Sequence, residues 1–315
     1  MNTSEHVTVL VTGAGGPAGV AVIRRLRQDG HRVIAMDCDT SAVGLRLADA
    51  AVVGPRSADP TFVDTLLDVA SNHGVDAVIS TVAEELGVLS DAHPAFEAAD
   101  VAHWFPSRDA VETCVDKWKF AEVLRGTGIP IPATNRSADG VPGPWIVKPR
   151  FGRGSRDVFS VDDPDDLPWV LAHVPDPIVQ TRLQGREFTA DGLIDLGGTL
   201  VGCVPRWRTE TKAGISTKGE TFLHDGVNEL VHATALAVGL TGPICLQGFL
   251  DEDGTLGLVE VNPRFSGGLP LSLAAGCDLV GQYLAAMLGR EIDRTRLTTR
   301  PGVSMLRYFE EVFEG

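Results

Sequence analysis

Three polar residues near the C-terminus could bind a metal ion and an anion together. Glu260, Asn262 and Arg264 stand at alternate positions where the apolar run Leu256–Val261 ends. Alternate residues of a strand point to one face, and Pro263 limits how far the strand can continue in a sheet. Carboxylate and amide oxygens suit Mg²⁺, and an arginine can clamp a phosphoryl or carboxylate group. The spacing therefore indicates a Mg²⁺ site beside an anion contact. The alternative is a solvent-exposed strand end.

A glycine-rich turn near the N-terminus points to a different chemistry. Gly13, Gly15 and Ala18 follow an apolar run and open a stretch with helical spacing, and Asp37 closes the next apolar run. This spacing matches the dinucleotide-binding fingerprint, so a NAD(P)-dependent oxidoreductase is the alternative function. The second interpretation is that the glycines serve a tight turn and close helix packing. Neither tyrosine has a lysine four positions later, as a short-chain reductase would require.

Composition narrows the class of protein. The chain has 315 residues, 43% of them hydrophobic, and a net charge of −15. This length suits two or three subdomains, and the negative charge argues against a nucleic-acid binder. No apolar run reaches the ~18 residues of a membrane span, and Met1–His6 lacks the features of a secretory signal. The five cysteines form no C-x-x-C pair, so reduced thiols in a cytoplasmic protein are expected.

The helices and strands that must position these residues follow one pattern in the first part of the chain and another in the second. The runs Val7–Val11, Val20–Gln28 and His31–Asp37 predict a strand, a helix and a second strand. This β-α-β pattern continues to about residue 104 and predicts an open parallel sheet. Two helix starts follow, with Ser107 and Asp116 as expected N-caps.

The second half of the chain predicts mostly strands and turns. A proline-rich linker, 129–144, leads into the strand Trp145–Lys148. Short alternating runs then predict a strand-rich C-terminal part, with one helix at about 226–238. The charged stretch Arg206–Lys218 is expected to be a loop that shapes an acceptor pocket. The fold class is therefore α/β, with an α+β character in the C-terminal part.

Read in chain order, these features resemble the ATP-grasp superfamily, and most closely the branch related to the carbamoyl-phosphate synthetase large chain. The resemblance spans about Asp116–Gly289 and rests on two lysines, a glycine-rich loop and the closing E-x-N-P-R motif. It implies an N-terminal pre-ATP-grasp domain at 1–106. A central and lid subdomain at 107–182 and a C-terminal subdomain at 183–315 would follow.

The resemblance implies a nucleotide site between these subdomains. Lys119 resembles the basic residue near the phosphates of ATP, and Lys148 the lysine between the α-phosphate and adenine. The loop Arg150–Arg156 resembles the lid over the phosphates, the strand Ile178–Leu183 the adenine hinge, and Glu187 the ribose contact. The implied nucleotide-binding residues are Lys119, Lys148, Gly152, Gly154, Ser155, Gln180, Leu183 and Glu187.

The resemblance also implies a metal site with two Mg²⁺ ions, with Mn²⁺ as an alternative. Gln247, Glu260 and Asn262 stand at the ligand positions, although an acid is more usual where Gln247 stands. Asp251 is a substitute for Gln247 as the third ligand. Arg264 resembles the arginine that stabilises the transferred phosphoryl group. Lys212 is a second candidate anion contact.

An ATP-dependent carboxylate–amine ligase is the function that this resemblance implies. ATP would convert a carboxylate to an acyl phosphate, and an amine would then displace phosphate to form an amide or peptide-like bond. The expected partners are a small carboxylate and a small amine in a biosynthetic reaction, with neither nucleic acid nor membrane. The sequence leaves a homodimer open.

Overall fold

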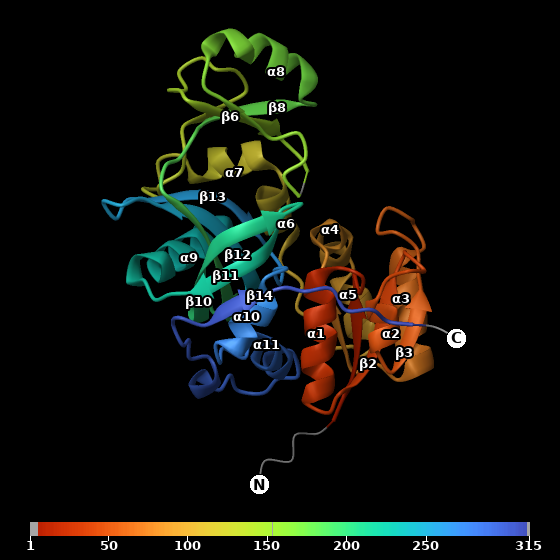
Figure 1. Ribbon diagram of the computed structural model, residues 1–315. Helices are drawn as coiled ribbons and strands as arrows, with labels where there is room; N and C mark the ends of the chain where they lie inside the picture. The colour runs from red at the N-terminus through yellow and green to blue at the C-terminus, as the bar shows by residue number, and fades with distance from the viewer. Residues whose placement is uncertain (1–5, 153, 314–315) are drawn as a thin grey trace.

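The computed structural model describes residues 6–152 and 154–313, which form three sheets (Figure 1). The first sheet is parallel, with strand order β3-β2-β1-β4, as the β-α-β pattern predicts. Its strands are β1 (Thr8–Thr12), β2 (Arg32–Asp37), β3 (Ala50–Val53) and β4 (Ala77–Ser80). Except for His6, the segment Met1–His6, on which the expectation about a secretory signal rests, lies outside the described residues.

Helices cover both faces of this parallel sheet. Leu10 of β1 packs into a core with Phe62 and Phe96, while Val9 and Val11 face the opposite side. Alternate residues of β1 therefore supply two cores, which explains its nearly continuous apolar sequence. The helices of this layer are α1 (Pro17–Gln28), α2 (Gly44–Leu47), α3 (Phe62–His73), α4 (Ala83–Asp91) and α5 (His93–Ala98).

The second sheet is antiparallel and six-stranded, with order β13-β12-β9-β10-β11-β14. Its strands are β9 (Arg186–Ile194), β10 (Leu200–Lys212), β11 (Ile215–Thr221), β12 (Gly242–Leu250), β13 (Leu256–Asn262) and β14 (Ser304–Leu306). One face packs against α6 (Arg108–Val115), α7 (Lys117–Leu124) and α9 (Asp225–Val238). Ser107 accepts a hydrogen bond from Ala110 N, and Asp116 accepts from Trp118 N, so both predicted N-caps are confirmed.

The expectation of a loop at Arg206–Lys218 is wrong. The segment continues β10, turns at Ala213–Gly214 and returns as β11. Trp207 points to one face, where its ring stacks on Phe222 with a centroid distance of 3.9 Å. Its neighbours Arg206 and Arg208 point to the opposite face. That face lines a polar site. Because the inward-facing residues are charged, the sequence lacks the apolar–polar alternation by which a half-buried strand is recognised.

The third sheet forms a small lid above the larger body (Figure 1). Its order is β5-β8-β6-β7, and all its pairs are antiparallel. The strands are β5 (Thr134–Asn135), β6 (Trp145–Pro149), β7 (Phe159–Val161) and β8 (Pro177–Thr181), with η1 (Pro164–Asp166) and α8 (Leu167–His173). The three sheets fall within 8–80, 134–181 and 186–306, while the exact subdomain boundaries stay a prediction.

The parallel layer and the six-stranded sheet share one hydrophobic core. Val22 of α1 and Leu193 of β9 belong to the same buried cluster as Leu284. Tyr283 donates to Trp104 O at 2.6 Å across this interface. The elements involved include α10 (Leu269–Ala274) and α11 (Leu279–Met287), and the short helix η2 (Arg294–Arg296) follows them. These parts form one body. Within the described ranges, no helix is both long and apolar enough to cross a bilayer.

Candidate active site

One face of the six-stranded sheet brings together the residues predicted to bind metal. Gln247 on β12 lies opposite Glu260 on β13, and Asn262 follows two positions later. On the other side of β12, Thr189 of β9 lies opposite Gln247. Because alternate residues share a face, Glu187 belongs to the same surface. Predicted ribose and metal residues thus lie on three adjacent strands.

Glu187 is held by two neighbours on this face. Gln247 Nε2 donates to Glu187 Oε1 at 2.5 Å, and Arg208 Nη1 lies 3.1 Å from the same oxygen. Burial raises the pKa of Glu187, Arg208 and Gln247 oppose that shift, and Glu260 adds to it. The Glu187 and Glu260 carboxylates are therefore close enough to repel each other, as a site that receives cations requires.

Lys148 approaches this carboxylate pair from the lid. Its side chain is buried, with 5% of its surface exposed. Burial lowers the pKa of Lys148 to about 8; Glu260 opposes the shift and Lys117 adds to it. A lysine of β6 thus faces a carboxylate of β13 across the boundary between lid and body.

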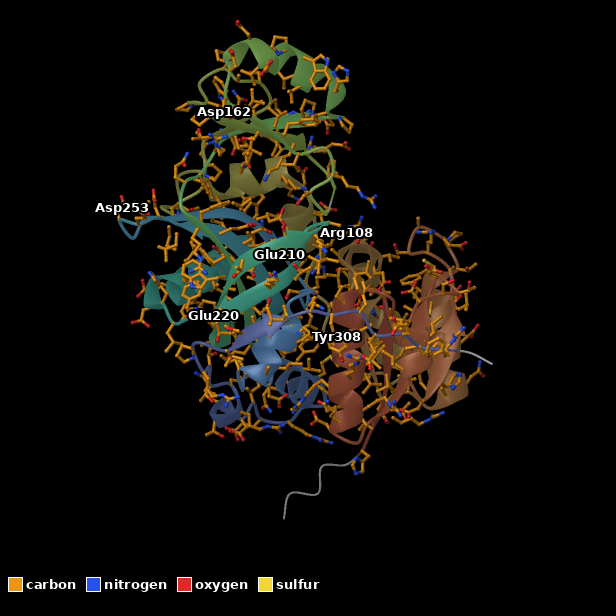
Figure 2. All side chains as sticks on the ribbon, in the orientation of Figure 1. Arg108, Asp162, Glu210, Glu220, Asp253 and Tyr308 are labelled. Atoms are coloured by element: carbon orange, nitrogen blue, oxygen red, sulfur yellow. The ribbon has the colours of Figure 1, made fainter. Side chains whose placement is uncertain are left out.

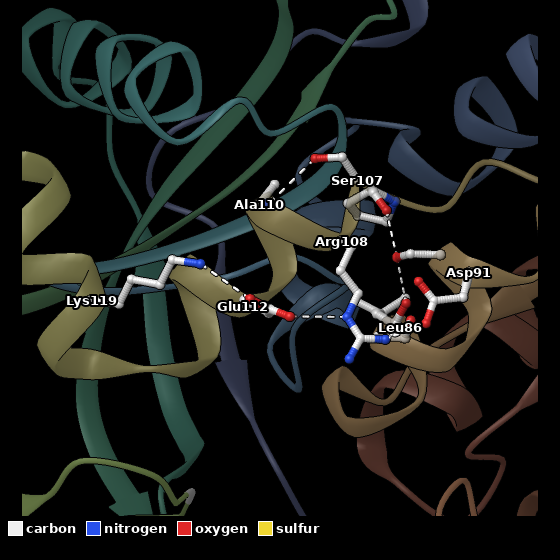
Figure 3. Close-up of polar contacts among 10 residues, drawn as sticks. Leu86, Asp91, Ser107, Arg108, Ala110, Glu112 and Lys119 are labelled. Atoms are coloured by element: carbon white, nitrogen blue, oxygen red, sulfur yellow. Dashed lines mark hydrogen bonds and ion pairs between the residues drawn. The ribbon is translucent and has the colours of Figure 1, made fainter.

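Lys117, which was not among the predicted site residues, lies closer to this site than Lys119. Lys117 Nζ donates to Gly152 O at 2.8 Å. Burial lowers the pKa of Lys117, and Glu260 is the first of the charges that oppose this shift. Lys119 Nζ instead lies 3.2 Å from Glu112 Oε2, in the surface network of Figure 3.

Helix geometry explains this difference. Residues two positions apart on a helix are related by a rotation of ~200°, so the two lysines of α7 point to nearly opposite sides. Asp116 caps the helix and also pairs with Arg150, which joins the start of α7 to the lid loop. In the sequence, the feature that could have pointed to Lys117 is its position directly after the predicted N-cap Asp116.

The predicted lid loop joins β6 to β7 beside these lysines. Gly152 and Gly154 have φ angles of +138° and +69°, and Ser155 has +55°. All three are exposed, so their backbone groups are accessible to a ligand. Arg153 lies outside the described residues.

The hinge residues occupy the boundary between the lid and the body. Gln180 is buried on β8, opposite Ile146, and its Nε2 donates to Thr134 Oγ1 at 2.9 Å. Leu183 packs against β13, where a Cβ on Gly257 would lie 2.7 Å from its Cδ1 atom. Both residues thus lie where the chain passes from the lid into the body.

The loop after β13 is anchored from beneath. Arg264 Nη2 donates to Asn262 Oδ1 at 3.1 Å. Arg206 is buried, forms an ion pair of 2.9 Å with Asp191, and donates to Ser266 Oγ at 2.7 Å. Burial alone would raise the pKa of Asp191, but Arg206 holds this pKa below its usual value. A buried charged network therefore fixes the segment that presents Arg264.

The two remaining predicted residues lie at hairpin ends. Lys212 is exposed at the tip of the β10–β11 hairpin. Asp251 lies in the β12–β13 turn and its backbone pairs with Thr255, whereas Gln247 lies directly opposite Glu260. Figure 2 shows Asp253 of the same turn at the outer end of the hairpin. The register therefore favours Gln247 over Asp251 as the third ligand.

The chemistry of this donor set fits Mg²⁺. Glu260 and Glu187 offer carboxylate oxygens, and Asn262 and Gln247 offer amide oxygens, all of them hard ligands. The described part of the chain brings no three His, Cys, Asp or Glu side chains together as metal ligands. This composition suits an ion that is also held by the phosphates of a substrate.

Comparison with known proteins identifies the kind of domain that carries this site. Residues 173–310 match the family model "ATP-grasp in the biosynthetic pathway with Ter operon". This segment of the chain is an ATP-grasp domain. Residues 9–103 match the model of the PylC-like N-terminal domain, which places the parallel sheet before the ATP-grasp module. A comparison with curated proteins gave no match.

Solved structures share this ATP-grasp fold at low sequence identity. L-amino acid ligase from Bacillus licheniformis is 18% identical, with a TM-score of 0.74 over 95% of this chain and 78% of that one. Biotin carboxylase from Campylobacter jejuni is 17% identical, with a TM-score of 0.73 over 95% and 75%. N5-carboxyaminoimidazole synthetase from Staphylococcus aureus, complexed with ADP, is 15% identical, with a TM-score of 0.72 over 93% and 80%.

The N-terminal glycines serve close packing, which was the second interpretation of the fingerprint. A Cβ on Gly13 would lie 2.2 Å from Val82 Cγ2, and one on Gly15 would lie 2.9 Å from Ala42 Cβ. Asp37 Oδ2 accepts a hydrogen bond from Gly15 N at 2.7 Å. Neighbouring residues thus fill the space that the glycines leave. The carboxylate expected to bind a ribose is bonded to the turn itself, so nothing here supports the oxidoreductase alternative.

Proposed function

We propose that this chain is an ATP- and Mg²⁺-dependent ligase that joins a small carboxylate to a small amine. The observation that carries the proposal is a pair of lysines, the buried Lys148 and the half-buried Lys117, which face Glu260 where the lid meets the body. A site with cations on one side and carboxylates on the other suits a nucleotide whose phosphates hold metal ions.

The reaction proceeds in two balanced steps. A substrate carboxylate oxygen attacks the γ-phosphorus of ATP, the bond to the β-phosphate oxygen breaks, and ADP leaves. The amine nitrogen then attacks the acyl phosphate carbon, phosphate leaves with the electron pair of the carbon–oxygen bond, and the nitrogen loses a proton. Positioning and charge stabilisation are the protein's main contributions, so a nucleophilic side chain is not required.

Each residue has one role in this proposal. Lys148 and Lys117 bind phosphate oxygens, with Lys117 in the role first expected of Lys119. Glu187 binds the ribose, and Arg264 stabilises the transferred phosphoryl group. Gly152, Gly154 and Ser155 cover the phosphates with backbone groups, Gln180 and Leu183 border the adenine pocket, and Lys212 contacts the acceptor. Glu260, Asn262 and Gln247 would hold Mg²⁺, which neutralises phosphate charge when bound.

We also propose that the site holds two metal ions, with Mn²⁺ as a substitute for Mg²⁺. The protein is proposed to be a cytoplasmic homodimer, and each chain to have the subdomain limits 1–106, 107–182 and 183–315. Small-molecule biosynthesis is the proposed setting. The L-amino acid ligase among the structures of the same fold supports an amino acid as the first carboxylate to try.

Ligand binding and turnover test this function. We expect Mg·ATP to raise the melting temperature while NAD(P)H leaves it unchanged. A screen of carboxylates paired with amines, read as ADP release, should then identify the substrates. Stabilisation by NAD(P)H alone would refute the ligase.

A variant of Glu260 connects turnover to this site. Glu260→Ala should reduce substrate-dependent ADP release by about 10³-fold, because the phosphate charge loses its metal ligand. The melting temperature without ligand should stay within a few degrees of the wild-type value. Glu220→Ala, on the exposed face of β11 (Figure 2), is the matched control and should keep wild-type turnover. Equal loss in both variants would contradict the assigned role of Glu260.

A further inference from the structure

The tip of the β10–β11 hairpin touches the lid loop directly. The turn residues Ala213 and Gly214 have φ angles of +47° and +75°. A Cβ on Gly214 would lie 2.9 Å from Gly154 Cα, and a Cβ on Gly154 would lie 3.4 Å from Ala213 O. Two backbones meet here because neither glycine carries a side chain. The hairpin tip is therefore a support for the lid loop.

Arg208 connects this tip to the nucleotide end of the site. Its side chain is 7% exposed, and its Nη1 atom lies 3.1 Å from Glu187 Oε1. Its Nη2 atom donates to Gly214 O at 2.9 Å. The planar guanidinium thus holds a carboxylate with one nitrogen and the turn with another, which a point charge cannot do equally well.

Two further features show that Arg208 is not an ordinary strand residue. The pairing of β10 with β11 shifts register immediately after Arg208, between Arg208 and Glu210. Such irregularities bend a hairpin and redirect its end. In addition, Arg208 Nε is a buried donor without a partner among the described residues. An unpaired buried donor is costly, so a retained one points to a functional role.

We propose that Arg208 is a positioning residue that couples the ribose end of the nucleotide site to the lid loop. The inference rests on the proposed function. A nucleotide that binds Glu187 orders this carboxylate, and the guanidinium then holds the hairpin tip against Gly154. The lid loop is thereby kept over the phosphates. Arg208 itself contacts neither the reacting carboxylate nor the transferred phosphoryl group.

Trypsin reports the position of the lid loop, because Arg150 and Arg156 lie within it. The test variant is Arg208→Lys, which keeps a positive charge for Glu187 but has no planar fork to reach Gly214. Without nucleotide, we expect cleavage in the loop to be about tenfold faster than in the wild type, since a hydrogen bond to a charged group is lost. Mg·ATP should protect the wild-type loop and protect the variant much less.

Turnover and binding should separate in the same variant. We expect kcat for ADP release to fall about tenfold or more, because small displacements of positioned groups are costly. The Kd of Mg·ATP, measured by calorimetry, should change by only about threefold, because Arg208→Lys leaves Lys148 and the charge beside Glu187 in place. A purely structural role would instead lower the melting temperature and leave the ratio of kcat to Kd unchanged.

A glycine pair provides the matched control. Gly214→Asn tolerates a positive φ but places a Cβ against Gly154, so it should reproduce the faster lid cleavage with Arg208 intact. Gly140→Asn makes the same change at φ +71°, where nothing lies within 4 Å of the new Cβ. Trypsin should cleave the lid loop of this control variant at the wild-type rate.

The outcomes distinguish this inference from the function on which it rests. Wild-type rates of lid cleavage in Arg208→Lys and Gly214→Asn, with and without Mg·ATP, would overturn the coupling and leave the ligase intact. A wild type that does not bind Mg·ATP at all would overturn both. Faster cleavage in both variants, together with a loss of kcat at nearly constant Kd, supports the coupling.

Discussion

The body and the lid bury their apolar side chains in different ways. In the body, Val9 and Leu297 belong to one cluster, so residues from both ends of the chain share a core. In the lid, the buried cluster lies entirely between Val141 and Val179. Unfolding any part of the body therefore exposes surface in several elements, whereas the lid can open at the cost of its own few contacts.

This difference divides the site into a fixed half and an adjustable half. Glu187, Gln247 and Glu260 lie on paired strands of the body. Lys148 and the loop after it belong to the lid. A nucleotide can thus be admitted by movement of the lid while the proposed metal ligands keep their geometry. The following predictions test whether the two halves are as independent as their cores imply.

The largest effect is expected in the body, for Phe188→Ala. Phe188 is fully buried on β9 beneath the site, and its ring packs edge-on against Phe222. Removing it should lower the free energy of unfolding by about 3–5 kcal/mol, through lost burial and an unfilled cavity. Urea denaturation followed by fluorescence measures this loss. Phe309→Ala, at a residue that is 92% exposed, is the control and should change little. An equally small change in both variants would show that burial of the Phe188 ring does not stabilise the body.

A smaller and local effect is expected in the lid, for Val179→Ala. Val179 is fully buried in the lid cluster, so losing two methyl-sized groups should cost about 2 kcal/mol. Hydrogen exchange should show faster exchange between 141 and 179, with body amides unchanged. Val158→Ala, at a half-exposed residue of the lid, should leave exchange as it is. Faster exchange in β9 and β12 would mean that the lid and the body unfold together.

The sequence predicted the body better than the site, for a physical reason. Strand and helix periods identified the parallel sheet, and Ser107 and Asp116 were found as N-caps because capping is a local interaction. Arg206–Lys218 was missed as a hairpin because the face that looked exposed lines a site. Whether a charged residue faces solvent or another element depends on the packing of distant segments, which local patterns do not contain.

The same limit applies to the two lysines of α7. Lys117 and Lys119 are equivalent in composition, and only the orientation of the helix decides which one points to Glu260. That orientation follows from the packing of Phe120 and Leu124 into the body core. The resemblance therefore points to the segment, while the proposal of Lys117 in place of Lys119 depends on the structure.

We expect Lys148, which the lid contributes to the site, to make the affinity for Mg·ATP depend on pH. Burial lowers the pKa of Lys148 to about 8. If Lys148 binds phosphate as proposed, the phosphates of ATP favour its charged form. The charged fraction falls from ~0.9 at pH 7 to ~0.1 at pH 9, so the affinity for Mg·ATP should drop about tenfold over this range. Calorimetry in buffers of different ionisation enthalpy should detect proton uptake on binding near pH 8.

Two variants test whether Lys148 causes this dependence. Lys148→Arg should remove the slope because its charge persists, and Lys119→Met should leave the slope unchanged. The free energy of unfolding changes with pH in the opposite direction to the affinity. Between pH 8 and 10.5 the unfolded lysine keeps its proton and the folded one has lost it, so the free energy of unfolding rises with pH. A flat affinity from pH 7 to 9 in the wild type would separate Lys148 from the nucleotide.

The smallest effect is expected where the body touches the lid, for Ala213→Gly. Ala213 adopts φ +47° in a two-residue turn, a conformation that costs an alanine more than a glycine. Glycine gains freedom in the unfolded chain, which offsets part of that relief, so the net stabilisation should be at most about 1 kcal/mol. Thermal unfolding measures the gain. Asp100→Gly, at φ +54° and far from the lid, should give a gain of similar size. If both variants gain stability but only Ala213→Gly changes lid cleavage, the gain in stability is not what alters cleavage, and the hairpin tip transmits its conformation to the lid.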